Sequence, residues 1–389
     1  MRQLLVTILA IAMLISLCSC KKQPATQTPG TTQHIQTTPP IVSNEDAQYE
    51  QMPMYAVSLS PVTEETADDD GKVRFVYSYQ NLSLFLPEAE VAEKIYINYL
   101  SRMDRANQYA ASVRSDSLDE AYGLLSTFPL FYDIRYSPCR FDKGVLSMRI
   151  TESIYLGGVH PDTINSFTTY NLLSGASLNL SDILCKDVKA KSIANTVNQK
   201  LSENPSNKEF WTNYQDTIIE IFQVGLEKVE NWYLSNEGLC FNFDAYILAS
   251  YATGPITATI PYSELTGILL DEYFPAEQDN YTGTLLAEVF TLDAQAEFTQ
   301  FSEVVLAKDG TKILLSADGV LTDIVIQAKK ENQSELSGNV VMAVQFLSPG
   351  DAIMVEIDSS ATELVITYQH GDKDERKTIT CDQDNITIS

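Results

Sequence analysis

"FYDIRYSPCRFDKGVLSMRITESIYLGG", residues 131–158, has the pattern of a β-hairpin. Its two arms are separated by an Asp-Lys-Gly triplet at residues 142–144, a composition that is typical of tight turns. In the second arm, the apolar residues Leu146, Met148 and Ile150 alternate with polar residues. Successive side chains of a strand point to opposite faces of a sheet. The alternation therefore predicts an antiparallel sheet with one face in the core and the other in water.

Segments with the periodicity of amphipathic helices lie on both sides of this hairpin. The first follows Pro87, carries glutamates in its first turn, and is predicted to end near residues 114–117. Its predicted apolar stripe consists of Ala92, Ile95, Tyr96, Tyr99, Leu100 and Met103. Further helices are predicted near residues 188–201 and 212–231. We therefore predict an α+β domain over residues 54–278, in which helices cover an antiparallel sheet.

The pattern changes in the last part of the chain, residues 279–389. Short apolar runs follow one another there, and no long amphipathic helix interrupts them. Turn-forming residues separate the runs at Lys308–Asp309–Gly310, Ala317–Asp318–Gly319, Ser348–Pro349–Gly350 and His370–Gly371–Asp372. This spacing predicts an all-β, sandwich-like domain of about seven or eight strands.

The first part of the chain has the composition of a bacterial lipoprotein signal. Residues 1–19 contain one arginine before an apolar run that is shorter than a membrane span. The Leu-Cys-Ser-Cys sequence that ends at Cys20 resembles a lipobox, with Cys20 as the lipidated residue. Lipidation of Cys18 and an uncleaved membrane anchor are the alternatives. Residues 20–53 are rich in Thr, Gln and Pro, which predicts a disordered tether. We expect a lipid-anchored, extracytoplasmic protein of the cell envelope, with the membrane leaflet left open.

The charge of the chain limits the partners that it can bind. The sequence has 52 acidic and 26 basic residues, which gives a formal net charge of −26. Such a chain repels polyanions, so nucleic acid is excluded as a partner, whereas a cationic protein is attracted. The alternative is that the acidic residues only keep an extracytoplasmic protein in solution.

Cysteine and histidine residues give no indication of a metal or cofactor. Four cysteines lie in the predicted folded part, namely Cys139, Cys185, Cys240 and Cys381. Their even number permits disulfides outside the cytoplasm, and their spacing leaves all three pairings open. The chain has three histidines and no HExxH motif, and no two of these four cysteines are close together in the sequence. We therefore expect neither a metal site nor a cofactor.

The Gly-Gly-Val-His-Pro segment at residues 157–161 has two interpretations. As a catalytic base, His160 would need an oriented carboxylate, for which Asp162 and Glu152 are the candidates. As part of a turn, it would follow two glycines that permit positive φ and precede a proline that fixes φ. The sequence has no nucleophile elbow, catalytic Cys-His motif or phosphate-binding glycine loop. We favour the turn.

Two blocks of sequence carry a resemblance to a known family. The first block consists of Gly157, Gly158, Val159, His160, Pro161, Tyr170, Asn171, Leu172, Gly175, Leu178, Leu180, Ser181 and Asp182. The second consists of Tyr246, Ala249, Tyr251, Ala252, Gly254, Pro255, Ile260, Pro261, Tyr262, Ser263, Glu264 and Leu265. Over about residues 73–271 the chain resembles an extracytoplasmic domain of unknown function that a lysozyme-sensing anti-sigma factor shares with a peptidoglycan deacetylase. It departs at Ala245, Ile247 and Ser250, where the family has Pro, Glu and Pro, so a role of that glutamate does not carry over.

Tyrosine is abundant in this chain, with 20 residues. Three tyrosines of the second block could form an aromatic surface for a glycan or a protein, because tyrosine combines apolar area with a hydroxyl group. The alternative is that they pack in the core. The candidate binding residues are Gly157, Gly158, His160, Pro161, Tyr246, Tyr251, Gly254, Pro255 and Tyr262.

Two hypotheses of function follow. The first is a non-enzymatic envelope lipoprotein that binds or senses a partner. The resemblance implies lysozyme-like muramidases or peptidoglycan as that partner, and the usually basic muramidases suit an acidic chain. The second hypothesis is an envelope glycan hydrolase that uses carboxylates as acid and base. We favour binding over catalysis and assign no catalytic residue.

Overall fold

The computed structural model describes residues 54–118, 128–276, 281, 283–290, 298, 300–307, 310–330, 339–358, 362–370, 373–382 and 385–389. The predicted signal peptide, the lipidation site Cys20 and the predicted tether lie outside these residues, as do parts of the turns predicted at 308–310 and 370–372. Within the described part of the chain, none of the helices is long and apolar enough to cross a membrane.

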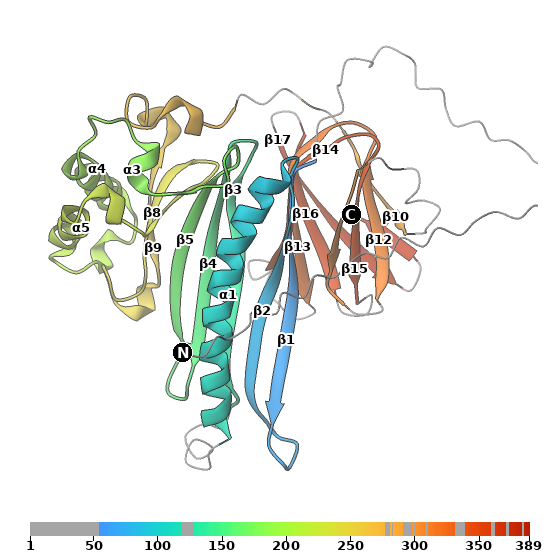
Figure 1. Ribbon diagram of the computed structural model, residues 1–389. Coiled ribbons are helices and arrows are strands. Elements are labelled where there is room, and N and C mark those ends of the chain that lie inside the picture. The colour runs from blue at the N-terminus through green and yellow to red at the C-terminus, as the bar shows by residue number, and fades with distance from the viewer. Residues whose placement is uncertain are drawn as a thin grey trace, which may run out of the picture. The chain divides into compact units, whose positions relative to one another are not determined.

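One sheet of eleven strands runs through the described residues (Figure 1). Its strands, in spatial order, are β18 (Asn385–Ile388), β17 (Lys373–Asp382), β16 (Thr362–His370), β13 (Leu321–Lys330), β14 (Asn339–Leu347), β1 (Ala56–Ala67), β2 (Val73–Phe85), β3 (Leu130–Phe141), β4 (Val145–Tyr155), β5 (Asp162–Asn171) and β6 (Ser177–Leu178). β1 pairs with β14, with Ala56 opposite Val344. This pairing joins the regions predicted at 54–278 and 279–389 in one sheet.

The hairpin predicted at 131–158 is formed by β3 and β4. The Asp142 carboxylate closes its turn, since Oδ1 accepts hydrogen bonds of 2.8 Å from the backbone N–H groups of Gly144 and Val145. The predicted wet face is wrong at the start of β4, where Val145 and Ser147 are both 0% exposed. A second, smaller sheet covers this face, so β4 is buried on both sides there.

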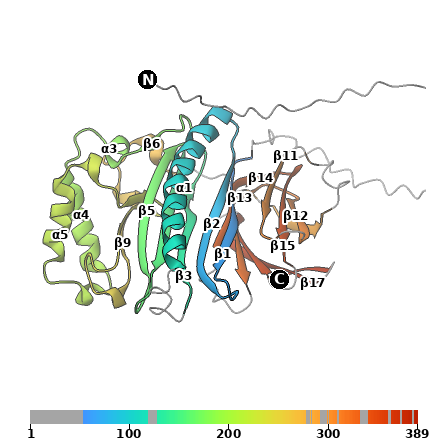
Figure 2. The same ribbon diagram turned by 60° about the horizontal axis from the view of Figure 1, so that its bottom comes forward.

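A long helix, α1 (Ala89–Ser117), covers the other face of the sheet and ends within the predicted range. In Figure 2 it runs along strands β2–β5. Its buried residues are Val91, Ile95, Tyr99, Met103, Ala106, Ala110, Val113 and Ser117. Tyr96 and Leu100, which were predicted in the stripe, are 41% and 46% exposed, because the sheet contacts one narrow line along the helix. The helix also allows β2 and β3 to pair in parallel, since a parallel connection needs a crossover.

The second sheet contains β7 (Trp232–Leu234), β8 (Gly238–Phe243) and β9 (Ile256–Pro261). Helices α3 (Leu180–Ile183), α4 (Ala190–Glu203) and α5 (Tyr214–Gln223) share its core (Figure 1). Short 3₁₀ turns lie at Asn207–Glu209, Leu226–Lys228, Tyr251–Thr253, Tyr262–Glu264 and Asp271–Tyr273. The helix predicted to reach residue 231 ends earlier, because Gly225 adopts a φ of +102°.

Gly238 gives a test of how closely β8 and β9 pack. A Cβ atom at Gly238 would lie 2.1 Å from the backbone oxygen of Ile260. Gly238→Ala is therefore expected to lower the free energy of unfolding by about 1–3 kcal/mol, because β9 must move away. Gly144→Ala is the matched control, since its nearest contact would be an ordinary 3.6 Å and its expected effect is below about 1 kcal/mol. Urea denaturation measures both, and equal effects would contradict the packing argument.

The C-terminal part has the predicted sandwich-like arrangement. A four-stranded sheet, in the order β10 (Leu285–Val289), β12 (Thr311–Ala317), β15 (Asp351–Ile357) and β11 (Gln300–Val305), shares a hydrophobic core with β13, β14, β16 and β17. β11 and β15 pair in parallel. The described residues from 281 onward form nine strands, β10 to β18, rather than seven or eight, because the chain pairs again after β17. The α+β fold class with a β-rich C-terminal part is confirmed.

Candidate functional site

The Gly-Gly-Val-His-Pro segment forms the turn between β4 and β5. Gly157 and Gly158 have φ values of +90° and +130°, a region that favours glycine. The Tyr155 hydroxyl donates a 3.1 Å hydrogen bond to the carbonyl oxygen of Gly158. His160 Nδ1 lies 3.1 Å from the carbonyl oxygen of Pro161. The geometry is that of the turn favoured from the sequence.

A tyrosine from a distant segment packs against this turn, and a second tyrosine packs beside the first. The ring of Tyr251 stacks on His160, with centroids 3.9 Å apart and planes 16° apart. Its hydroxyl donates to the Pro161 carbonyl oxygen at 3.3 Å. Tyr246 adds a further ring, with its centroid 5.7 Å from that of Tyr251. We call His160, Tyr246 and Tyr251 the aromatic face.

Hydrogen bonds on both sides hold the segment that carries Tyr246. The Asp244 carboxylate accepts hydrogen bonds from Asn165, from its backbone N–H at 3.0 Å and from its side-chain Nδ2 at 2.7 Å. Four residues later, Leu248 is fully buried, and its carbonyl oxygen accepts a 2.7 Å bond from the Trp211 backbone N–H. Residues 245–247 therefore form a loop that is fixed at both ends by hydrogen bonds.

This loop and the neighbouring turn expose apolar and aromatic side chains to solvent. Tyr246 is 60% exposed and has a φ of +70°, a conformation that is strained for any residue except glycine. Ile247, the next residue, is 43% exposed. Val159, next to His160 in the chain, is fully exposed. Strained backbone positions are concentrated at functional sites, so this loop is a candidate site.

A catalytic His160 would need a carboxylate partner, and no carboxylate of the described residues contacts its side chain. Glu152 accepts hydrogen bonds from Arg102 at 2.9 Å and from the Tyr132 hydroxyl at 2.7 Å. Burial, together with this bond to Glu152, raises the pKa of Tyr132. Asp162 begins β5, and no side-chain contact between it and His160 is found in the described part of the chain. His160 is instead held by the stacked ring and the turn.

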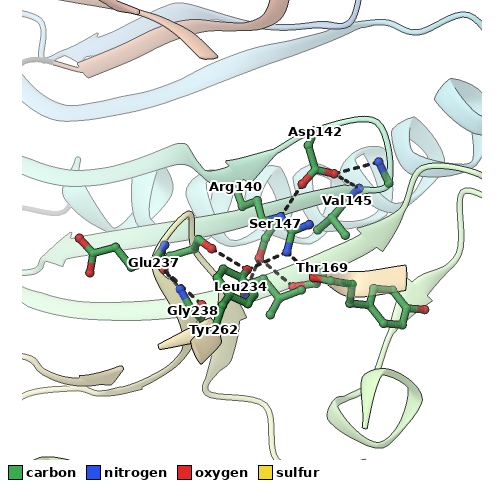
Figure 3. Close-up of polar contacts among 12 residues, drawn as sticks. Arg140, Asp142, Val145, Ser147, Thr169, Leu234, Glu237, Gly238 and Tyr262 are labelled. Atoms are coloured by element: carbon green, nitrogen blue, oxygen red, sulfur yellow. Dashed lines mark hydrogen bonds and ion pairs between the residues drawn. The ribbon is translucent and has the colours of Figure 1, made fainter. Parts of the chain in front are cut away.

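Tyr262 does not join the aromatic face. It follows the end of β9 near Gly238, whereas Tyr251 precedes the start of that strand. Its hydroxyl accepts a 2.7 Å hydrogen bond from Arg140 Nη1 (Figure 3). It also donates a 2.8 Å hydrogen bond to the carbonyl oxygen of Ser235. Burial raises the pKa of Tyr262, and the Arg140 charge partly opposes that rise. Tyr262 is thus a structural contact at the other end of the small sheet.

Arg140 is the centre of this second cluster. Its side chain is 3% exposed, and Nε lies 2.5 Å from Asp142 Oδ2. Nη1 also donates a 2.6 Å hydrogen bond to the carbonyl oxygen of Tyr273. Figure 3 shows Arg140 beside Ser147, whose hydroxyl lies 2.8 Å from the Thr169 hydroxyl. The cluster joins the turn of the large hairpin to the small sheet.

The remaining predicted site residues lie in a turn before β9, and the described cysteine side chains form no disulfide. Gly254 has a φ of +73°, and the exposed Pro255 directly precedes β9. Cys139, Cys185 and Cys240 are free thiols, and burial raises the pKa of the Cys139 thiol to about 12. The side chain of Cys381 lies outside the described residues. Where the chain is described, no three His, Cys, Asp or Glu side chains are grouped so that they could hold a metal ion.

A protein-family model matches part of this chain. The model of DUF3298, a protein family of unknown function, matches residues 181–263. The chain contains a DUF3298 domain. This domain includes α4, α5 and the small sheet, and it carries Tyr246, Tyr251 and Tyr262. His160 lies outside the matched residues, so the aromatic face combines the DUF3298 domain with the β4–β5 turn.

Solved structures of DUF3298 proteins are similar to part of this chain. A member of the family from Bacteroides fragilis NCTC 9343 is 18% identical, with a TM-score of 0.42 over 56% of this chain and 94% of that chain. A DUF3298 family protein from Pseudomonas aeruginosa PAO1 is 15% identical, with a TM-score of 0.40 over 57% of this chain and 97% of that chain. Comparison with curated proteins gives no match.

Sequence reasoning did not find Arg140 or Asp244. A register shift between Pro138 and Arg140 places Arg140 opposite Ser147, on the face of the small sheet. Strict alternation would have placed Arg140 with the apolar residues under α1. The signal that could have revealed this is Pro138, because a proline inside a strand pattern indicates a bulge.

Proposed function

We propose that this chain is a binding protein of the bacterial cell envelope that captures a cationic protein of the lysozyme type through its aromatic face. The observation that carries the proposal is the stack of His160 on Tyr251, beside a strained and exposed Tyr246 on a supported loop. In this proposal, a lipid on Cys20 holds the protein at the membrane, and residues 20–53 connect the anchor to the folded part.

Two physical arguments support a protein as the partner. Rigid aromatic side chains bind with a small loss of conformational entropy, and they commonly dominate the energy of an interface. The formal net charge of −26 would attract a basic muramidase over long distances and speed its capture. Peptidoglycan, which the sequence resemblance also implies, is the second ligand to test on this face.

The variant Tyr246→Gly tests the proposal sharply. Glycine adopts a φ of +70° without strain, so the variant loses the ring while the loop keeps its shape. We expect the affinity for hen lysozyme, measured by titration calorimetry at low salt, to fall at least about 10-fold. The melting temperature is expected to stay the same or to rise.

The control is Tyr96→Ala, which removes a 41% exposed tyrosine from α1, away from the aromatic face, and should leave binding unchanged. Absence of heat with lysozyme at low salt would refute the proposal, and heat with soluble peptidoglycan fragments alone would indicate peptidoglycan as the ligand instead. Release of reducing sugar from peptidoglycan by the purified protein would instead support the hydrolase hypothesis.

A further inference from the structure

A cavity of about 300 Å³ lies between helix α1 and the strands that this helix covers. Its lining combines side chains of α1 with side chains of β2, β3, β4 and β5. Among the described residues that line it, only Arg102 and Arg105 carry a charge. The volume is at the lower end of the range of about 300–1,000 Å³ that is usual for small-molecule sites. A chain with a formal net charge of −26 thus contains a cavity whose own charges are positive.

The Arg102 guanidinium is held in place through one of its three nitrogens. Nη1 donates hydrogen bonds to Glu152 Oε1 at 2.9 Å and to Ser166 Oγ at 3.0 Å. Nε and Nη2 make no hydrogen bond with any described residue, and neither atom is closed off from solvent. The Nε–Nη2 edge of a guanidinium carries two parallel N–H donors, which match two oxygens of a carboxylate or a phosphate. This edge is therefore open to a ligand while the rest of the group is fixed.

The carboxylate beside Arg102 balances only part of the positive charge. The second oxygen of Glu152 accepts a 2.7 Å hydrogen bond from the Tyr132 hydroxyl, so both carboxylate oxygens are already engaged. Arg105 lies three residues further along α1 and is exposed. It donates a 3.1 Å hydrogen bond to the Ser101 hydroxyl and forms no ion pair with any described residue. Two guanidinium groups and one carboxylate leave a net positive charge at the cavity.

The tyrosines of the cavity floor do not compete for these cations. The Tyr99 hydroxyl donates a 2.9 Å hydrogen bond to the carbonyl oxygen of Gln80. Burial raises the pKa values of Tyr136 and Tyr170, and the Arg102 charge partly opposes both rises. These phenols are uncharged at neutral pH, so the floor supplies no anion of its own.

We propose that this cavity binds a small molecule through a carboxylate or phosphate group. Two oxygens of that group accept hydrogen bonds from Nε and Nη2 of Arg102, and Arg105 contributes the second positive charge. The site is separate from the aromatic face, because the two lie on opposite faces of β5. Ser166 is bonded to Arg102 on the α1 face, whereas the preceding Asn165 is bonded to Asp244 beside the small sheet. The proposal goes beyond the protein capture proposed above and does not depend on it.

The test is titration calorimetry of the purified full chain at low salt with malonate, citrate, inorganic phosphate and glycerol 3-phosphate. Saturable binding of at least one of these anions is expected, and the series that binds more tightly identifies the group as carboxylate or phosphate. Glycerol, which lacks an oxyanion, should not bind. Added NaCl is expected to weaken the binding, because salt screens charges that are open to solvent.

Two arginine variants and a matched control locate the site. Arg105→Gln is expected to weaken anion binding at least about 10-fold and to keep the melting temperature, because Arg105 is exposed. Arg102→Lys keeps a charge beside Glu152 but lacks the Nε–Nη2 edge, so a similar loss of affinity is expected. The control, Arg114→Gln, removes an arginine of the same helix that pairs with Glu64 outside the cavity lining, and it should leave binding unchanged.

Tyr246→Gly should also leave anion binding unchanged, which distinguishes this site from the aromatic face. The proposal is overturned if none of the four anions binds, or if the Arg105 and Arg102 variants both bind as tightly as the parent chain. It is also overturned if Arg114→Gln weakens binding as much as Arg105→Gln does, since any surface arginine would then be equivalent.

Discussion

Raising the pH above about 10 is expected to unfold this protein cooperatively, because a cluster of buried tyrosines lies in the described part of its core. Five of them lie in the core between α1 and the sheet, namely Tyr77, Tyr99, Tyr132, Tyr136 and Tyr170. Burial raises the pKa of Tyr99 and of Tyr170 to about 12. Burial also raises the pKa values of Tyr77, Tyr132 and Tyr136.

The direction of the effect follows from which state holds the proton. An unfolded tyrosine loses its proton near pH 10, whereas the folded protein keeps these phenols neutral to a higher pH. The stabilisation is therefore complete below pH 10 and is lost as the pH rises through 12. A rise of the pKa from 10.0 to about 12 corresponds to about 3 kcal/mol for each of Tyr99 and Tyr170, which together approach the whole stability of a typical domain.

Absorbance at 295 nm follows tyrosine ionisation, and circular dichroism follows unfolding in the same titration. The ionisation of the buried tyrosines and the loss of structure are expected to coincide in one steep step. Tyr170→Phe removes one of the shifted groups and should move the step to higher pH. A gradual ionisation near pH 10 with the structure intact would show that these phenols are not buried in solution.

Replacement of Arg140 by alanine is expected to lower the free energy of unfolding by about 3 kcal/mol. The guanidinium joins three parts of the chain, through the Asp142 carboxylate, the Tyr262 hydroxyl and the Tyr273 carbonyl oxygen. In the alanine variant these three groups would lose their contact with the guanidinium. Water could replace it only poorly, because the arginine side chain is 3% exposed. Arg140→Lys keeps the charge but lacks the planar fork, so an intermediate loss is expected.

The matched control is Arg135→Ala on the same strand. Arg135 pairs with Asp133 at 2.6 Å, but the Arg135 side chain is 43% exposed, so the expected loss is below about 1 kcal/mol. Chemical denaturation at neutral pH measures all three variants. Equal losses for Arg140→Ala and Arg135→Ala would contradict the structural role of the buried cluster.

Local sequence patterns predicted the positions of turns and helices better than they predicted which strands pair with each other. The Asp-Lys-Gly turn at 142–144 and the end of α1 near 117 follow from residues within a few positions of each other, and both are confirmed. The central strand β1 was not predicted, because its sequence contains Pro61 and a run of polar and acidic residues. It forms a strand because β2 and β14 supply hydrogen-bonding partners on its two sides.

The candidate site shows the same division. The glycine-rich turn around His160 could be predicted because positive φ and fixed proline φ are local properties of the chain. The stack of Tyr251 on His160 could not, since it depends on Asp244 holding one loop against another strand. Tyr262 was grouped with Tyr246 and Tyr251 because the three are close in sequence. Strand β9 separates Tyr262 from the other two, and the Tyr262 hydroxyl accepts a hydrogen bond from Arg140.

The sequence by itself determined the α+β class, the main hairpin and the positions of most turns, because periodicity and turn chemistry act over a few residues. Only the tertiary structure decided that one sheet continues from β14 to β1 and that Arg140 is buried. Each of these depends on pairs of residues that are more than 100 positions apart, and such pairs form only when the whole chain buries its apolar surface together.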